Sequence, residues 1–329
     1  MLNDKFQQIA SSDSIEVYTA VMTRVLVTGS RGFLGSSFVR ELELVGFEVI
    51  RHTRQDANLL DCMETLDFLE KSLPDLIIHC AAVVGGIKAN IDGGSRFYLQ
   101  NMEIDFNVLS AAHKLEVENL IYFGSSCMYP ANRFEPLKIE DLMTGPLEPT
   151  NYNYALAKIV GSHTTSSIAE ASGRNWRTVI TSNLYGPRDC FDREKSHLLA
   201  SIIRKAVEAS ELQLSSISMW GDGKARREFT FAPDLVNWIV SQLNNLSALP
   251  LVMNVGYGED YSIREYYEMV LEVLSLDIQI KSDPSMPSGN LRKLMDSSIA
   301  KGYGWNPATS LREGIKETIN WYRNGGQVE

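Results

Sequence analysis

The chain has 329 residues, of which 44% are hydrophobic and 22% charged, so it is long enough for one large folded unit or two fused ones. Its formal net charge of −10, from 31 basic and 41 acidic residues, gives no overall field that attracts a polyanion. We therefore expect no nucleic-acid partner, although a few arginines in a cleft can still bind a small anionic ligand.

The four cysteines are Cys62, Cys80, Cys127 and Cys190. They show neither CxxC spacing nor the density of a disulfide framework, so we expect no metal site and a reducing, cytoplasmic location. Residues 1–21 are polar, lack a signal-peptide apolar segment and are treated as an N-terminal extension; Met22 is a candidate alternative start. No run reaches membrane-spanning length, so no membrane partner is expected.

From Arg24 onward, short apolar, β-branched runs alternate with longer helical stretches. The predicted strands cover residues 24–29, 47–52, 76–82, 119–126 and 177–183, and the predicted helices cover residues 32–45, 63–71, 96–114 and 152–171. Strands without polar alternation, each followed by a helix, indicate a parallel sheet that is covered on both faces. The predicted fold class is therefore α/β, a doubly wound parallel sheet of the Rossmann type.

The rhythm changes after about Tyr185 to shorter helices and isolated strands. We predict a dinucleotide-binding domain over residues 22–184 and a smaller α/β substrate-binding cap over 185–329, with 228–250 returning to the first domain. Ligands of such sheets lie at the carboxyl ends of the strands, so the cap is expected to close over that edge.

A glycine-rich loop follows the first predicted strand. The stretch "TGSRGFLG" places Gly29, Gly32 and Gly35 between that strand and a helix, with Phe33 and Leu34 opening the helix. Glycine suits this position because the turn is tight, the backbone must approach a pyrophosphate, and the helix N-terminus favours an anion. The loop predicts dinucleotide binding rather than an ordinary strand-to-helix turn.

The second predicted strand ends without the acidic residue that accepts a ribose hydroxyl. It reads "VIRHTRQD", and Arg54 here, together with Arg31 in the glycine loop, is suited to a ribose phosphate. The predicted cofactor is NADP(H) rather than NAD(H); the alternative is that both arginines are simply solvated.

A Tyr-x-x-x-Lys pair lies on the helix predicted over 152–171. Tyr154 and Lys158, four residues apart, share one helix face, and Ser125 adds a hydroxyl at the end of a strand. Three such groups can converge on one carbonyl oxygen, and a lysine beside a tyrosine is expected to favour ionisation of the phenol. Together with the glycine loop, this pattern is typical of a short-chain dehydrogenase/reductase.

A thiol stands two residues beyond the serine. If strand geometry persists, Cys127 faces the same cleft as Ser125, where a thiolate can remove a proton next to a ketone. That chemistry needs an acid on the opposite face, and His197, at the start of a predicted cap helix, is the best candidate. The alternatives are that Cys127 only fills a small apolar space and that His197 is structural.

Several longer stretches resemble one family. They are "HCAAVVGGI", "FNVLSAAHKL", "YFGSSCMYP", "LMTGPLEPTNYNYALAKIVG", "SNLYGPRDCF", "WGDGKARREF" and "GWNPATSLREGI". From about Arg24 to Tyr322 the chain is similar to the GDP-L-fucose synthase family, NADPH-dependent 3,5-epimerase/4-reductases of the extended short-chain dehydrogenase/reductase class. The resemblance implies oxidoreductase and isomerase activity on a GDP-linked 4-keto sugar, GDP-4-keto-6-deoxy-D-mannose, and a homodimer formed by the helices near 96–114 and 152–171.

The same resemblance implies roles for individual residues. Ser125, Tyr154 and Lys158 would form the reductase triad, Cys127 would be the epimerisation base and His197 its acid. The residues implied to bind the cofactor are Gly29, Arg31, Gly32, Phe33, Leu34, Gly35, Arg54, Ala81, Ala82, Tyr154, Lys158, Asn183 and Leu184. Those implied to bind substrate are Gly85, Gly86, Ser126, Asn183, His197, Lys205, Trp220 and Arg227.

The chain departs from the family pattern in the cap. The family's Lys-Pro-Asp-Gly turn reads Met-Pro-Ser-Gly at 286–289, its Gly-Pro-Asn-Asp-Asn-Phe reads Gly-Pro-Arg-Asp-Cys-Phe at 186–191, and an aspartate pair has become Pro233-Asp234. Because these departures lie in the cap, which is expected to recognise the substrate, the sequence supports the type of reaction better than the identity of the sugar. The alternatives are another GDP-4-keto sugar of the dideoxy or heptose type, a reductase without epimerase activity, a UDP-hexose 4-epimerase, and a catalytically silent dinucleotide-binding partner or sensor.

Overall fold

The computed structural model describes residues 24–285 and 290–326. The proposed N-terminal extension, residues 1–21, and the altered turn at 286–289 lie outside the described residues. Among the described residues, no helix combines the length and the apolar character needed to cross a bilayer.

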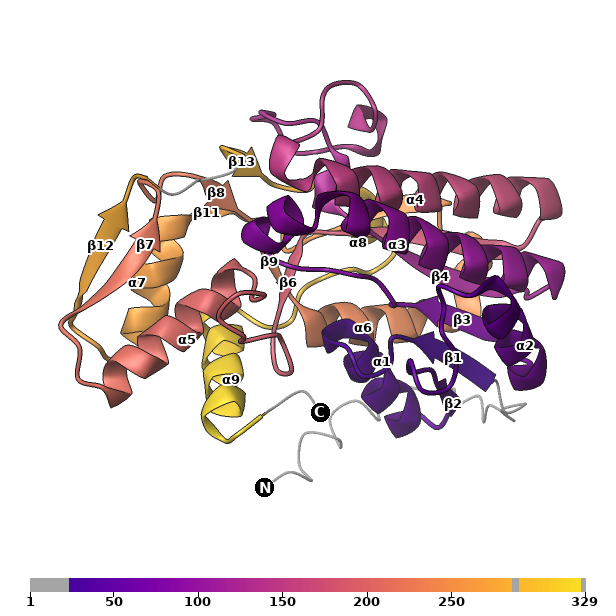
Figure 1. Ribbon diagram of the computed structural model, residues 1–329, viewed down its shortest axis with the longest axis horizontal. Helices are drawn as coiled ribbons and strands as arrows, with labels where there is room; N and C mark the ends of the chain where they lie inside the picture. Colours follow the sequence, from indigo (N-terminus) through magenta and orange to yellow (C-terminus); the bar gives the residue numbers. More distant parts are fainter. Residues whose placement is uncertain (1–23, 286–289, 327–329) are drawn as a thin grey trace.

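A parallel sheet forms the centre of the molecule (Figure 1). Its strands, in spatial order, are β10 (Val252–Val255), β5 (Asn175–Thr181), β4 (Asn119–Ser125), β3 (Leu76–His79), β1 (Arg24–Thr28) and β2 (Glu48–Arg51). The strands are apolar because helices bury both faces. On β1, Val25 and Val27 join the core on one face, whereas Leu26 joins the core on the other.

Helices cover both faces of this sheet. They are α1 (Phe33–Leu44) and α6 (Ala232–Gln242) on one face, and α2 (Cys62–Ser72), α3 (Ile87–Lys114) and α4 (Tyr152–Ser172) on the other. This arrangement confirms the predicted doubly wound α/β class. Helix α3 starts earlier than the predicted residue 96, and its helical backbone is interrupted at Gly94, where the Gly93-Gly94 pair had disguised the helical pattern.

The cap has its own apolar core. It contains helices α5 (Leu198–Glu211), α7 (Ile263–Val273) and α9 (Leu311–Arg323), the parallel pair β7 (Ser216–Trp220) and β12 (Gln279–Asp283), and the sheet β11 (Tyr261–Ser262), β8 (Arg226–Arg227) and β13 (Arg292–Lys293). Helices α7 and α9 both begin with a capping box, Ser262 with Glu265 and Ser310 with Glu313. These caps fix where two of the cap helices start.

The chain passes between the two cores more than once. Strand β6 (Asn183–Tyr185) leaves the sheet and pairs with β9 (Phe229–Phe231), which leads into α6. Helix α6 packs on α1, and β10 then completes the central sheet beside β5. After the cap residues that follow, α8 (Ser298–Gly302) and Trp305 pack again on the sheet core. The return to the sheet therefore includes residues beyond the expected limit of 250.

Candidate active site

A cavity of about 2090 Å³ lies between the carboxyl edge of the sheet and the cap. Pockets for single small ligands commonly measure about 300 to 1,000 Å³. This cavity therefore has room for a dinucleotide and a second ligand of similar size. Its walls come from the glycine loop, the ends of β3, β4 and β5, the first turns of α4, and the cap.

The glycine loop is held close to β3. Gly29 has φ +63°, and a Cβ on it would lie 2.9 Å from the Ala81 Cα; a Cβ on Gly35 would lie 2.2 Å from the Gly29 carbonyl oxygen. Only glycine fits either position. The N-cap of α1 is Gly32, and no side chain caps this helix end. The first-turn amides, which open toward the cavity, therefore fit the pyrophosphate of a dinucleotide.

Two arginines were predicted to contact a ribose phosphate of the cofactor. Arg31 and Arg54 both line the cavity, and both side chains are exposed. Asp56 binds the backbone amide of Thr53 at 2.7 Å, and hydrogen bonding by Thr53, together with the charge of Arg31, lowers its pKa. The glycine loop after β1 and the loop after β2 thus each carry one cation suited to a ribose phosphate. The other predicted cofactor residues on the cavity wall are Phe33, Leu34, Ala81, Ala82, Asn183 and Leu184.

The serine and the cysteine both face the cavity, but not because the strand continues. Strand β4 ends at Ser125, and residues 126–128 form a 3₁₀ turn. The Ser125 hydroxyl accepts the backbone N–H of Cys127 at 3.3 Å, and this bond turns the thiol back toward the cavity. Ser126 lies on the other side of the turn: it is 2% exposed and is not on the cavity wall, in contrast to its predicted contact with substrate.

Tyr154 and Lys158 lie in the first turns of α4 and line the cavity with Ser125. Lys158 is 3% exposed, and its Nζ lies 3.5 Å from Asp105 Oδ2 and 4.2 Å from the centre of the Tyr122 ring. The pKa of Tyr154 is raised, by burial first and then by Cys127 and Asp105. Burial of the phenol, Cys127 and Asp105 thus outweigh the effect expected of Lys158, which is paired with Asp105, and they favour the neutral phenol, the form that can donate a proton.

Asp105 organises a buried polar chain behind this pair. Its carboxylate accepts the Tyr122 hydroxyl at 2.5 Å and lies 3.1 Å from His79 Nε2, and His79 Nδ1 lies 2.7 Å from Thr28 Oγ1. Burial raises the pKa of Asp105, but Lys158 and His79 outweigh this effect, so the net shift is downward. Asp105 is therefore the counter-ion of Lys158, a role that the sequence analysis missed because the two residues belong to no common motif.

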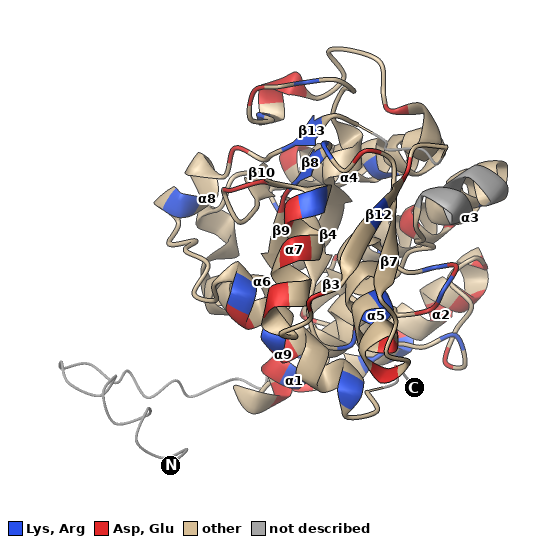
Figure 2. Ribbon diagram, turned by 90° about the vertical axis from the view of Figure 1, so that its left-hand side faces the viewer, with Lys and Arg blue, Asp and Glu red and all other residues tan. Residues whose placement is uncertain are grey.

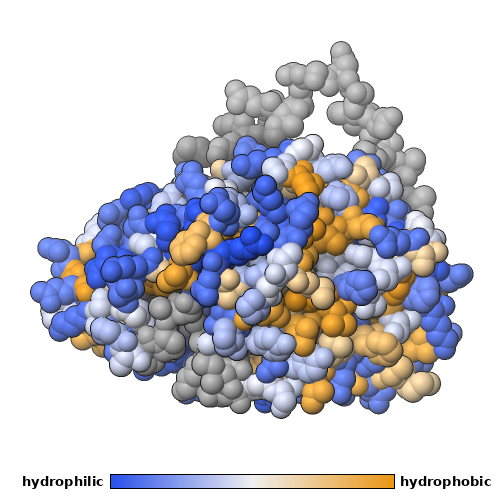
Figure 3. Space-filling model, turned by 90° about the horizontal axis from the view of Figure 1, so that it is seen from above, coloured by the Kyte–Doolittle hydropathy of each residue, from blue (hydrophilic) through white to orange (hydrophobic). Residues whose placement is uncertain are grey.

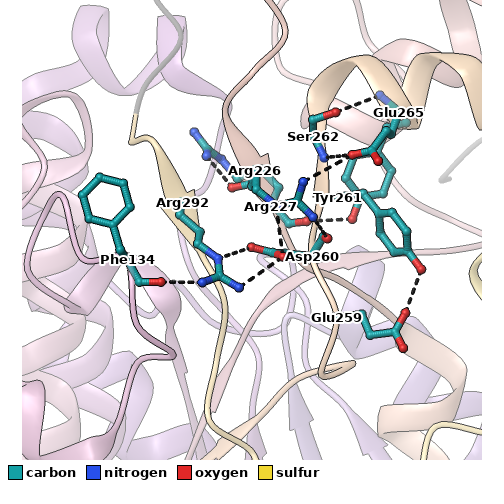
Figure 4. A network of polar contacts seen from close by, with 10 residues as sticks. Phe134, Arg226, Arg227, Glu259, Asp260, Tyr261, Ser262, Glu265 and Arg292 are labelled. Atoms are coloured by element: carbon teal, nitrogen blue, oxygen red, sulfur yellow. Dashed lines mark hydrogen bonds and ion pairs between the residues drawn. The ribbon is translucent and has the colours of Figure 1, made fainter.

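Strands β8 and β13 place two pairs of cations side by side (Figure 2). One in-register pair, Arg226 and Arg292, binds the carboxylate of Asp260, with Nε to oxygen distances of 3.2 and 2.5 Å (Figure 4). The next pair, Arg227 and Lys293, lines the cavity, because successive residues of a strand point to opposite sides. One pair is thus held by carboxylates of the cap, Asp260 and, 3.5 Å from Arg226, Glu265, and the other pair faces the ligand space.

Arg292 also ties the cap to the first domain. Its Nη1 donates to the carbonyl oxygen of Phe134 at 2.5 Å, in the loop between β4 and α4 (Figure 4). Across this junction, Lys293 Nζ lies 3.4 Å from Cys127 Sγ. Sequence reasoning missed Lys293, which stands 166 positions from Cys127; only the pairing of β13 with β8 brings it there.

The predicted substrate residues of the cap also reach the cavity. His197 is the N-cap of α5; its side chain is accessible to solvent inside the cavity, but the surrounding walls desolvate the ring and lower its pKa. Lys205 donates to the Ser218 carbonyl oxygen at 2.9 Å, and Trp220 is 38% exposed. The remaining predicted substrate residues on the wall are Gly85, Gly86, Asn183 and Arg227.

Comparison with known proteins agrees with this geometry. Residues 25–256 match the family described as "NAD dependent epimerase/dehydratase family". The chain belongs to this family. It is 40% identical to GDP-L-fucose synthase of Azorhizobium caulinodans, over 93% of this chain and 98% of that protein.

Two further relatives carry different sugar names. The chain is 37% identical to GDP-L-colitose synthase of Yersinia pseudotuberculosis, over 92% of this chain and 98% of the relative. A solved GDP-mannoheptose C4 reductase from Campylobacter jejuni with NADP bound superimposes with a TM-score of 0.83 at 29% identity, covering 92% of this chain and 98% of that one. The predicted resemblance to NADP(H)-dependent nucleotide-sugar epimerase/reductases is confirmed.

Proposed function

We propose that this chain converts GDP-4-keto-6-deoxy-D-mannose to GDP-L-fucose by epimerisation at carbons 3 and 5 and NADPH-dependent reduction at carbon 4. The observation that carries this proposal is the convergence of two chemical sets on one cavity. Ser125, Tyr154 and Lys158 suit the reduction of a ketone, and Cys127 and His197 suit proton transfer at the neighbouring carbons. The relatives named fucose synthase support this choice of sugar.

Epimerisation uses the acidity that the carbon 4 ketone gives to its neighbours. Cys127 as thiolate takes the proton from carbon 3 or 5, and the charge moves to the carbonyl oxygen, near the Ser125 and Tyr154 hydroxyls. His197 returns a proton on the opposite face. Desolvation by the cavity walls lowers its pKa, and an anionic diphosphate bound in the cavity would favour the charged ring, the form that donates a proton.

Reduction uses the same ketone. NADPH supplies the hydride to carbon 4 when bound. Tyr154, a neutral phenol in this site, gives its proton to the forming alkoxide. Lys158, 3.5 Å from Asp105, would hold the cofactor ribose and supply a positive charge beside the reacting oxygen. One set of hydroxyl donors thus serves both the enolate and the alkoxide.

The other readings differ in substrate or class. Two relatives are named for other sugars, GDP-L-colitose and GDP-mannoheptose, so the dideoxy and heptose alternatives are tested beside the main proposal. A UDP-hexose 4-epimerase would retain its cofactor without net turnover and would not need Cys127, and a silent dinucleotide-binding protein would not need the Cys127 and His197 pair at all. The cavity presents both residues, which favours the bifunctional enzyme.

A homodimer and a cytoplasmic location are part of the same proposal. Figure 3 shows apolar side chains gathered over α3 and α4. On α3, Leu99 is 54% and Phe106 62% exposed, and these residues are seven positions apart and so share one helix face. Burial of this face against a second copy would remove it from water. The four cysteines are free, as a reducing compartment would leave them.

The test is incubation of the purified protein with GDP-4-keto-6-deoxy-D-mannose in deuterated water, with and without NADPH. NMR reads deuterium at carbons 3 and 5 and the configuration of the product. We expect deuterium at both carbons and GDP-L-fucose when NADPH is present. Cys127→Ser should lose the exchange, whereas Cys62→Ser, which removes an exposed thiol outside the cavity, should retain it.

Other outcomes would reassign the protein. Reduction without exchange would make Cys127 a packing residue and leave a simple reductase. Tightly bound NAD without net turnover would favour a 4-epimerase. Failure with this sugar and turnover of a GDP-4-keto dideoxy sugar or heptose would move the assignment to that substrate.

A further inference from the structure

Lys293 differs from Lys158, Arg226 and Arg292 in the partner within reach of its charged group. The Lys158 ammonium has the carboxylate of Asp105, and the Arg226 and Arg292 guanidiniums share that of Asp260. Lys293 is 9% exposed, and within the described part of the chain the acceptor in hydrogen-bond reach of its Nζ is Cys127 Sγ, at 3.4 Å. The Glu148 carboxylate also interacts with this ammonium, but the group within hydrogen-bond reach of Nζ is the thiol, which compensates a buried ammonium well only as the thiolate.

We propose that Lys293 is a positioning residue that holds Cys127 as the thiolate, and so prepares the base that the proposed function assigns to proton removal at carbons 3 and 5. The assignment of that base rests on the proposed function. The charge pair itself rests only on the geometry of β13 and the turn after β4.

The other charged and titratable groups around Cys127 agree with a thiolate. Arg227 faces it from β8 and adds a second positive charge; Tyr154 faces it from α4 as a neutral phenol. Glu148, whose carboxylate interacts with both Lys293 and Arg227, offsets one of these two cations. One net positive charge therefore remains beside the sulfur, which favours its ionised form.

The proton balance follows from this arrangement. The Cys127 thiolate takes a proton from carbon and becomes the thiol, the substrate becomes the enolate, and the enolate takes a proton from His197 on its other face. The thiol then returns its proton to solvent and His197 regains one, so neither residue changes over the cycle. Lys293 keeps its proton throughout and acts only by stabilising the thiolate.

The test titrates the thiol in the ligand-free, full-length protein. Alkylation by iodoacetamide is followed from about pH 5 to 10, and mass spectrometry reads the peptide that contains Cys127, which separates it from the other three thiols. We expect Lys293→Met to raise the midpoint by about 1 to 2 pH units, and Lys293→Arg to restore most of this change. Lys224→Met removes an exposed lysine of the cap that is not on the cavity wall, and should leave the midpoint unchanged.

A second readout separates this inference from the proposed function. At a pH below both midpoints, each unit of midpoint shift lowers the thiolate fraction about tenfold, so deuterium exchange measured there should fall about ten- to a hundredfold in Lys293→Met while KM changes little. Lys293→Gln, which keeps a polar side chain, covers the case in which the methionine variant does not fold. An unchanged titration midpoint with a raised KM would overturn the inference and assign Lys293 to an anionic group of the substrate. If the wild-type protein exchanges no deuterium, the proposed function fails, while the titration still decides the charge pair.

Discussion

Replacement of Asp105 by asparagine removes the counter-ion of Lys158 without changing the size of the side chain. Asp105 is 2% exposed, and it contacts the Lys158 ammonium at 3.5 Å, the Tyr122 hydroxyl at 2.5 Å and the His79 ring at 3.1 Å. An amide can keep a hydrogen bond to one or two of these groups. It cannot neutralise the ammonium, which is left buried and uncompensated.

The expected loss of stability is large. Removing one partner of a buried ion pair commonly costs about 3 to 5 kcal/mol, so we expect Asp105→Asn to lower the free energy of unfolding by about 3 kcal/mol. Because the folded-state pKa of Asp105 lies below its unfolded value, its contribution is present above about pH 4 and is lost as the pH falls through the folded value. The difference between wild type and variant should therefore narrow in acid.

Thermal and urea unfolding, measured from about pH 2 to 8, test this expectation beside steady-state reduction near pH 7. We expect kcat for reduction to fall about ten- to a hundredfold, because Lys158 loses the partner that keeps it charged. Asp67→Asn is the matched control: it breaks an exposed pair with Lys71, 2.6 Å apart, and should cost less than about 1 kcal/mol. An Asp105→Asn protein that melts and reduces like the wild type would refute the role of this carboxylate.

Two further predictions concern the cofactor and the pH dependence of stability. Arg54→Ala should raise the KM for NADPH about tenfold, the loss expected for one charge-assisted hydrogen bond, and change the KM for NADH little; an unchanged ratio of the two constants would argue against a ribose-phosphate contact. Burial raises the pKa of Glu228 to about 7, so its favourable contribution to folding is present below about pH 4.5 and lost as the pH rises through 7. Glu228→Gln should therefore flatten the dependence of Tm on pH between about 5 and 8, and an equal slope in both proteins would contradict this assignment.

The parts of the site that could be predicted from sequence are local. The glycine loop could be predicted because Gly29 and Gly35 lie a few residues apart on the chain and occupy backbone positions that no other residue fits. Tyr154 and Lys158 are one helical turn apart, so their spacing places them on one face before any tertiary structure is known. The strands of the sheet could also be predicted from sequence, because strands buried on both faces are apolar throughout.

The parts that could not be predicted depend on contacts between distant segments. Asp105 and Lys293 carry charges that ordinary surface residues also carry, and only the packing of α3 against α4 and of β13 against β8 gives them specific partners. The raised pKa of Tyr154 also depends on such packing: the sequence shows the lysine four residues away, but neither the burial of the phenol nor the nearby carboxylate of Asp105. Ser126 was predicted to contact substrate, but it lies outside the cavity wall because residues 126–128 form a 3₁₀ turn instead of continuing the strand.

The late position of β10 has a consequence for how the protein is made. Its partner β5 ends at Thr181, but β10 begins only at Val252, after the chain has passed through α5, β7 and β8 of the cap. During synthesis, the edge of β5 therefore stays unpaired after Thr181 has been made. More than seventy further residues, from 181 to 252, must be added before β10 can pair with it. A fragment that stops before residue 252 would expose this apolar strand edge to other chains. We therefore expect a truncated first domain to aggregate.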